Sequence, residues 1–306
     1  MTNGVIWSSQ PWEGDTQHIV MSRRQNLEQH RRSLTEIREI MNSMKTLAYM
    51  ETRRLAPFLD AQRNVVQSME QVAADFLSFY PDAFGPVRKA TPLLIMIGAE
   101  RGFCGDFNRA LLNQLDEALR ERSSDMPLII AVGSKLHSLL EDNPHVVARL
   151  DGASTSEEVT AVLNQLVDQI ISLQAQHGAL EISCIFHDSD DGVSINSLVP
   201  PFQDLGAAPA QFTVPPILNM SPPAFLLELS DQYLFAALHA LLYTSMMAEN
   251  HDRVGHLDGA VRHIDDRSEE LARQCNALRQ EEIIEEIEVI LLSAESVTEE
   301  LGGDKV

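Results

Sequence analysis

The sequence has little cysteine, few aromatic side chains and a shortage of basic residues. Its three cysteines, Cys104, Cys184 and Cys275, form no CxxC pair, so a reducing compartment is indicated and a disulfide framework or zinc site is not. Aromatic residues make up 6% of the chain, which favours a helix-rich architecture over a sandwich or barrel. The 23 Lys and Arg against 45 Asp and Glu give a formal charge of −22, which argues against nucleic acid as a general partner.

Long apolar runs and nucleotide-binding motifs are also missing. No window approaches the roughly 18 to 20 consecutive apolar residues that a membrane span needs. Residues 1–20 lack a basic segment followed by an apolar one, so no export signal is indicated, and we expect a flexible extension there. The Walker A pattern G-x-x-x-x-G-K-[ST] does not occur. We therefore expect a soluble chain that remains where it is made.

Two long segments, residues 21–80 and 221–298, have the periodicity of amphipathic helices. Pro57 interrupts the first pattern locally and need only kink or restart the helix. Ile40 and Leu47 widen an apolar stripe whose members recur at helical spacings. These members are Leu27, Leu34, Ile37, Met41, Met44 and Ala48.

The second segment carries a heptad seam, which the spacing predicts to pack against another helix. The seam is formed by Leu257, Val261, Ile264, Leu271, Cys275 and Leu278. Its phase then slips by one residue and resumes at Ile283, Ile287, Ile290 and Ala294. A helix of roughly 75 residues would be about 110 Å long, more than a globular domain can bury. We therefore expect the two terminal helices to form an antiparallel coiled coil, followed by a flexible tail at 299–306.

The middle of the chain, residues 86–216, has a different character. Short apolar runs at 92–97, 127–132 and 181–187 alternate with helical patterns. This alternation predicts a mostly parallel sheet with right-handed crossovers, that is, a Rossmann-like domain. The overall expectation is an α/β fold, in which a central Rossmann-like domain accompanies a coiled coil of the terminal helices.

The stretch 98–108 (GAERGFCGDFN) should form the turn between the first strand and a helix. Its three glycines, Gly98, Gly102 and Gly105, do not have the G-x-G-x-x-G spacing of a dinucleotide site. Cys104 lies near Arg101 at a helix start, where reactive thiols occur, but no catalytic partner can be assigned from sequence. A structural turn is the favoured interpretation.

Two further stretches could bind ligands, and each has a simpler interpretation. Residues 133–135 (GSK) could hold an anion at a helix start, although an ordinary strand-to-helix turn is favoured. His251, His256 and His263 lie near Asp252 on the last helix and could form a surface metal site, although a solvated polar face is favoured. We expect neither a metal nor a cofactor.

Four separate stretches resemble the gamma subunit of F-type ATP synthases. Residues 101–108 (RGFCGDFN) are similar to the family signature D-R-G-L-C-G-G-[FL]-N, through Arg101, Gly102, Cys104, Gly105 and Asn108. Residues 37–55 are similar to its N-terminal helix, and residues 276–294 to its closing helix. Residues 246–250 (MMAEN) are similar to its S-L-A-S-E. The motifs occur in the family's order.

The resemblance implies a central-stalk rotor that is not itself an enzyme. The terminal helices would form a shaft inside a ring of alpha and beta subunits, and the α/β domain would meet epsilon and the membrane ring of c subunits. The complex would lie peripherally on the cytoplasmic face of the bacterial inner membrane. Residues matching shaft or partner contacts are Met41, Met44, Lys45, Arg53, Arg54, Arg279, Gln280 and Glu286.

Departures from the family pattern indicate a divergent member. Glu100 replaces the signature Asp, Phe103 the Leu and Asp106 the second Gly, and the last helix is unusually acidic. A second, specialised complex coupled to Na⁺ is a hypothesis that this sequence does not decide, since ion selectivity would reside in the c ring. The alternatives are a coiled-coil adaptor with an α/β head and, less favoured, a small enzyme acting at Cys104 and Gly133.

Overall fold

The computed structural model describes residues 13–83, 89–121, 126–202 and 214–302. The chain divides into two compact units. One, here called the head unit, is Lys45–Leu257, and the other, the coil unit, combines Met1–Met44 with Asp258–Val306. The two terminal helices contribute to both units.

These helices are longer than the sequence pattern suggests. Helix α1 spans Glu13–Phe79, so it begins inside the segment expected to be a flexible extension, and it continues through Pro57. Helix α5 spans Pro222–Gly302 and continues beyond the expected end at residue 298. The remainder of the two expected flexible ends, residues 1–12 and 303–306, lies outside the described residues.

The head unit contains a five-stranded sheet in the order β3-β2-β1-β4-β5. Strands β1, β2, β3 and β4 are parallel, and β5 is antiparallel to β4. This confirms the expected mostly parallel sheet, although β3 and β5 were not among the expected strands. The strands are β1 (Thr91–Ile97), β2 (Leu128–Val132), β3 (Val146–Leu150), β4 (Leu180–Asp188) and β5 (Gly192–Val199).

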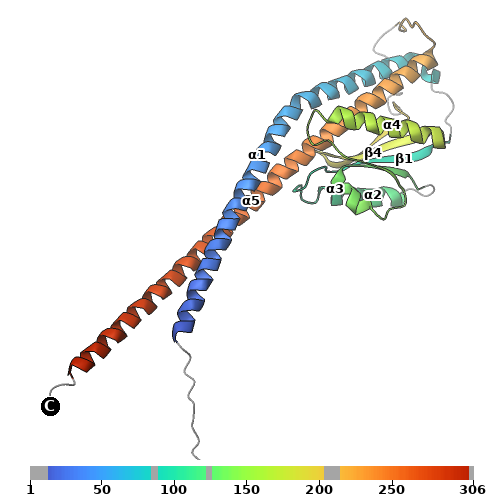
Figure 1. Cartoon of the computed structure of the whole chain (residues 1–306). Coiled ribbons are helices and arrows are strands. Elements are labelled where there is room, and N and C mark those ends of the chain that lie inside the picture. The colour runs from blue at the N-terminus through green and yellow to red at the C-terminus, as the bar shows by residue number, and fades with distance from the viewer. Residues whose placement is uncertain (1–12, 84–88, 122–125, 203–213, 303–306) are drawn as a thin grey trace, which may run out of the picture. The chain divides into compact units, whose positions relative to one another are not determined.

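Helices cover both faces of this sheet (Figure 1). Because side chains alternate along a strand, Leu94 and Met96 of β1 face one core with α2 (Phe107–Glu121) and α3 (Ser134–His137). Leu93 and Ile95 face the opposite core with α4 (Val159–His177). Short 3₁₀ turns at Pro81–Ala83 (η1) and Ser138–Leu140 (η2) complete the described elements.

The α4 face of the sheet also holds parts of the terminal helices. Leu55 and Leu59 of α1 and Leu238 and Leu242 of α5 are buried in the same core cluster. Contrary to expectation, one helix of the described residues, α5 between Pro222 and Leu292, is long and apolar enough to cross a membrane by length and composition alone. Core helices of soluble proteins meet the same criterion, and α5 contributes to this core.

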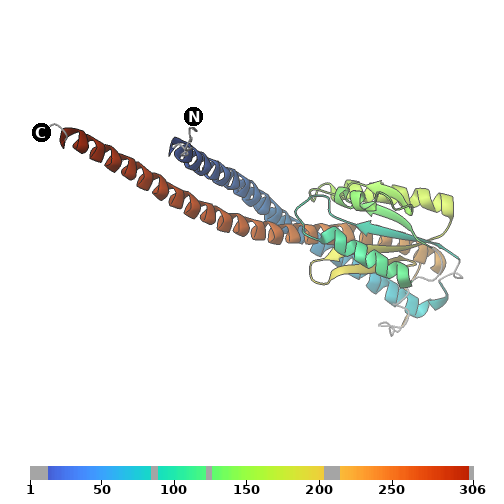
Figure 2. The ribbon, with the colours of Figure 1, turned by 90° about the horizontal axis from the view of Figure 1, so that it is seen from below.

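In the coil unit, α1 and α5 lie side by side and antiparallel (Figure 2). The Arg24 guanidinium pairs with the Glu282 carboxylate at 3.0 Å, and Nε of Arg38 donates to Oδ1 of Asp265 at 2.5 Å. The order of these pairs along the two helices is that of an antiparallel coil, as predicted.

Burial along α5 follows the predicted seam only in part. Val261, Ile264, Leu271 and Cys275 are buried, Leu257 is buried in the head unit, and Leu278 is half-buried. The expected continuation is wrong, since Ile283, Ile287, Ile290 and Ala294 are all exposed. On α1, Ile37, Ile40 and Leu47 are exposed, at 42%, 60% and 62%. The other expected members of the apolar stripe are half-buried, except Ala48, which is buried. Two helices cover only one narrow stripe of each other, so the flanks of a wide apolar surface remain exposed.

Candidate functional site

The turn between β1 and α2 is closed by a side chain of the same stretch, residues 98–108. Oδ1 of Asn108 accepts a hydrogen bond from the Ala99 N–H at 2.9 Å. A Cβ on Gly98 would lie 2.7 Å from that same oxygen and 2.7 Å from Cβ of Leu136, which cannot move away without its backbone, so glycine is required there. Gly105 has a φ of +61°, and Phe103, with a φ of +65°, holds its ring 47% exposed.

Two buried charged residues of α5 bond directly to this turn. The Glu249 carboxylate accepts hydrogen bonds from the backbone N–H groups of Glu100 at 3.1 Å and Arg101 at 3.0 Å. Nε of Arg253 donates to the Gly102 carbonyl at 3.0 Å, and the same guanidinium pairs with Glu249. A buried charge is tolerated only when it is paired and hydrogen-bonded, and both conditions are met here.

The Arg253 guanidinium also holds two neighbouring side chains. It donates to Oδ1 of Asn250 at 2.8 Å and contacts Sγ of Cys104 at 3.3 Å. Sequence reasoning missed Arg253, and it found Glu249 only as part of the family-like stretch 246–250. Their i, i+4 spacing was the available signal, but such pairs usually lie on a solvated helix face.

The Glu249–Arg253 pair, here called the anchor of α5, occupies the place where a sheet of this kind usually binds its ligand. β1 lies between β2 and β4, and ligands of open α/β sheets bind outside the carboxyl ends of the strands at the switch in strand order. In this chain the carboxylate of Glu249 accepts the N–H groups at the end of β1. The chain's own helix therefore takes the position of an anionic ligand.

The possible anion site at residues 133–135 is likewise occupied from within the chain. Oε2 of Glu100 accepts the N–H groups of Ser134 at 2.8 Å and Gly152 at 2.7 Å, and the Ser134 hydroxyl donates to the Glu100 carbonyl at 2.8 Å. Helix α3 is only four residues long. The Ser134 amide that an anion would use is bonded to Glu100, which the family pattern has as Asp.

Cys104 has the environment of a structural thiol. It is buried, and burial raises its pKa to about 12 despite the nearby Arg253 guanidinium. Its Sγ donates toward the carbonyl oxygens of Arg101 at 3.3 Å and Gly102 at 3.4 Å. A thiol with so high a pKa is protonated at neutral pH and is a poor nucleophile, which agrees with the favoured structural interpretation of the turn.

The histidines of α5 contribute no ligand cluster. His251, His256 and His263 are exposed. In the part of the chain that the structure describes, no group of three or more His, Cys, Asp or Glu side chains is placed to hold a metal ion. A different histidine, His187 of β4, is buried beside the turn, where its Nε2 bonds the Phe107 carbonyl at 2.8 Å.

Comparison with known proteins identifies the family. A family model described as ATP synthase matches residues 23–297. The ATP synthase gamma chain of Clostridium botulinum (strain Langeland) is 23% identical over 277 residues, covering 87% of this chain and 95% of the relative. The chain belongs to the ATP synthase gamma-subunit family.

Other members and solved structures agree with this assignment. The gamma chain of Geotalea uraniireducens is 22% identical over 275 residues, covering 87% of this chain and 95% of its own length. In fold, the chain is similar to the Tetrahymena thermophila mitochondrial ATP synthase central stalk/c-ring structure, with a TM-score of 0.52 and 17% identity. The match covers 72% of this chain and 99% of the Tetrahymena chain. The chain is also similar in fold to the rotor of the Euglena gracilis mitochondrial ATP synthase, with a TM-score of 0.52 and 14% identity. That match covers 86% of this chain and 99% of the Euglena chain.

The residues that the gamma-family resemblance marks as shaft contacts differ in their surroundings. Met41, Met44 and Lys45 are half-buried, whereas Arg279, Gln280 and Glu286 are exposed. The guanidinium of Arg53 lies 5.9 Å from the ring centre of Tyr49. Arg54 already pairs with Glu157 of the same chain, so contact of Arg54 with a partner subunit would compete with this pair.

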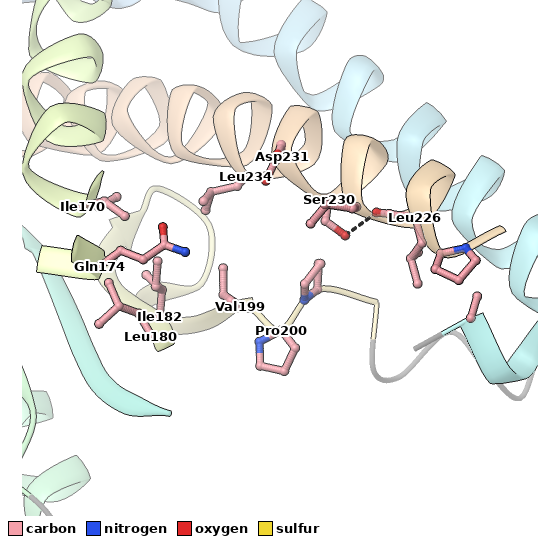
Figure 3. A pocket seen from close by; sticks show the side chains of 14 residues that line it. Ile170, Gln174, Leu180, Ile182, Val199, Pro200, Leu226, Ser230, Asp231 and Leu234 are labelled. Atoms are coloured by element: carbon pink, nitrogen blue, oxygen red, sulfur yellow. Dashed lines mark hydrogen bonds between the residues drawn. The ribbon is translucent and has the colours of Figure 1, made fainter. Parts of the chain in front are cut away.

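A separate hollow of about 470 Å³ lies in the head unit between α4, β4, β5 and the start of α5 (Figure 3). Among its described lining residues Asp231 is the one ionisable side chain, and Ser230 donates its hydroxyl to the Leu226 carbonyl at 2.7 Å. The described lining of the hollow therefore offers no acid/base pair for catalysis. The most extensively hydrogen-bonded site described in the head unit is therefore the contact of Glu249 and Arg253 with the turn after β1.

Proposed function

We propose that this chain is the central-stalk rotor subunit of an F-type ATP synthase and is not itself catalytic. The observation that carries the proposal is the family match over residues 23–297, which includes most of both terminal helices and the whole sheet. The bonds of Glu249 and Arg253 support it, because they join α5 to the turn that follows β1. A rotor needs such an attachment to transmit torque.

The proposed partners are the alpha and beta subunits around the shaft, and epsilon and the c ring at the head. One solved relative in fold is described as OSCP/F1/c-ring, and another as central stalk/c-ring. Rotation would present different faces of an asymmetric shaft to the catalytic sites and so change their affinities in turn. The proposed location is peripheral, on the cytoplasmic face of a bacterial inner membrane, and coupling to Na⁺ stays a hypothesis.

The chemistry of the turn supports a non-catalytic role. Backbone N–H groups at the end of β1 and at Ser134 donate to Glu249 and Glu100. A nucleotide phosphate bound there would have to displace both carboxylates. Cys104→Ala should therefore leave the ATPase activity of an assembled complex unchanged, whereas a loss of turnover in a correctly folded variant would support a thiol enzyme.

The decisive experiment is co-expression of the full chain with the alpha and beta subunits encoded nearest to it. Purification through a tag on this chain should yield three alpha and three beta subunits for each copy, with ATPase activity that depends on the chain. The control is the same preparation without it. A chain that purifies alone or as a homodimer would favour the adaptor.

The basic patch of α1 gives a second proposal about coupling. We propose that Lys45, Arg53 and Arg54 contact acidic parts of the beta subunits, with Arg53 contributing most because Arg54 is paired within the chain. Arg53→Glu should lower the ATP-synthesis yield of the complex more than its thermal stability. Arg262→Glu on α5, exposed in an i, i+4 pair, is the matched control. Equal ATP-synthesis yields in the two variants would contradict the proposed contact of this patch with the beta subunits.

A further inference from the structure

The end of α5 combines exposed aliphatic side chains with one sign of charge. From residue 281 to 302 the sequence contains no Lys, Arg or His. Within this segment Glu281, Glu286 and Glu288 are exposed. The large apolar side chains exposed beside them are Ile283, Ile284, Ile287, Val289, Ile290, Leu291 and Leu292. An apolar surface of this extent marks a protein-binding region.

The spacing of the glutamates at the end of α5 destabilises the helix itself. Glu281 and Glu285, like Glu282 and Glu286, are four residues apart, and like charges at this spacing destabilise a helix. One of the four, Glu282, is paired with Arg24 of α1. Oε2 of Glu285 is buried and has no hydrogen-bond partner among the described residues. Repulsion of this kind within an exposed segment is relieved when a binding partner supplies positive charge.

We infer that the end of α5 docks into a partner surface that is apolar and carries Lys or Arg side chains. The inference rests on the proposed function, which places this helix in a ring of alpha and beta subunits. It goes beyond that function because the basic patch proposed above for α1 contacts acidic parts of the beta subunits. At residues 281–288 this chain has the opposite polarity, so its ring must supply the cations. Charge complementarity then restricts the chain to its own partners.

The test compares two variants of the full chain that lose the same charge. Glu281→Gln, Glu286→Gln and Glu288→Gln together neutralise the end of α5. The matched control is Asp116→Asn, Glu117→Gln and Asp142→Asn, three exposed positions of the head. The measured quantity is the dissociation constant of each chain from its alpha and beta subunits at low and at high salt, with circular dichroism as a check of helix content.

The neutralised end should bind about tenfold more weakly at low salt, and the difference should vanish at high salt, where charges are screened. The control should bind like the unaltered chain. An affinity that is unchanged or increased in the neutralised variant would overturn this inference alone, because the complex would still form. If the unaltered chain formed no complex, both this inference and the proposed function would be overturned.

Discussion

Glu249 and Arg253, paired on one face of α5, together hold the backbone of three successive turn residues. The carboxylate accepts the N–H groups of Glu100 and Arg101, and the guanidinium donates to the carbonyl of Gly102. Both charges are buried, so each depends on the other and on the turn for compensation. The turn that resembles a ligand-binding loop is therefore the attachment point of the long C-terminal helix.

Removal of one member of this pair should be strongly destabilising. Arg253→Ala leaves the Glu249 carboxylate buried without its cation, and we expect a loss of about 3–5 kcal/mol in the free energy of unfolding, measured with urea. Arg262→Ala removes an exposed i, i+4 pair and should cost less than about 0.5 kcal/mol. The double variant Glu249→Met/Arg253→Met should recover part of the stability. A double variant as unstable as Arg253→Ala would contradict pairing as the cause.

The close approach of the turns after β1 and β2 should require Gly133. Its φ is +108°, and an added Cβ would lie 2.6 Å from the Gly98 carbonyl oxygen. Gly133→Ala should lower the melting temperature through both a steric clash and backbone strain, at a cost above about 2 kcal/mol. Gly178 provides the control, because its φ is +80° but nothing lies within 4 Å of an added Cβ. Gly178→Ala should cost only the backbone strain of a positive φ, about 1–2 kcal/mol. Equal effects would exclude the clash.

The seam of the coil unit should not tolerate charge. Leu271 is buried, and Leu271→Asp places a carboxylate among apolar side chains. The helical circular dichroism signal should then melt at a lower temperature, with a loss above about 3 kcal/mol. Ile264→Asp should act in the same way. Leu291→Asp, at an exposed position of the same helix, should leave melting of the isolated chain unchanged. A normal melting curve for Leu271→Asp would refute the coiled coil.

The stability of the head should fall on mild acidification. Burial lowers the pKa of His187, although its bond to the Phe107 carbonyl and the charges of Asp252 and Asp106 oppose this. The folded state thus favours neutral His187, and this stability is lost as the pH falls below about 6.5, where the unfolded chain takes up the proton. Burial lowers the pKa of His239 as well and adds to the effect. Asp252 counteracts it, because burial raises its pKa and the folded state favours its protonated form.

The variant His187→Gln tests whether His187 causes this pH dependence. Glutamine keeps an N–H donor for the Phe107 carbonyl but does not take up a proton in this pH range. Urea unfolding across this pH range should show a shallower pH dependence for this variant than for the unaltered chain. The exposed His177 provides the control, and His177→Gln should leave the slope unchanged. If His187→Gln retained the full slope, His187 would not be its source.

Local patterns predicted the elements that bury a regular set of side chains. The helical period found α1 and α5, and the branched apolar runs found β1, β2 and β4 at the centre of the sheet. They did not find β3 and β5 at the two edges, because edge strands are less buried and their apolar signal is weaker. The apolar period was also extended wrongly to Ile283 and Ile287, since a period does not reveal whether a second helix covers it.

The sequence by itself determined the long helices, the alternation of strands and helices, and the ordered motifs that indicate the gamma-subunit family. Each of these depends on residues close together in the chain. Only the tertiary structure decided that Glu249 is buried while Glu286, on the same helix, is exposed. The difference arises because a carboxylate can be buried only where hydrogen-bond donors and a cation compensate it. For Glu249 the donors come from a turn that is distant in sequence, which no local pattern encodes.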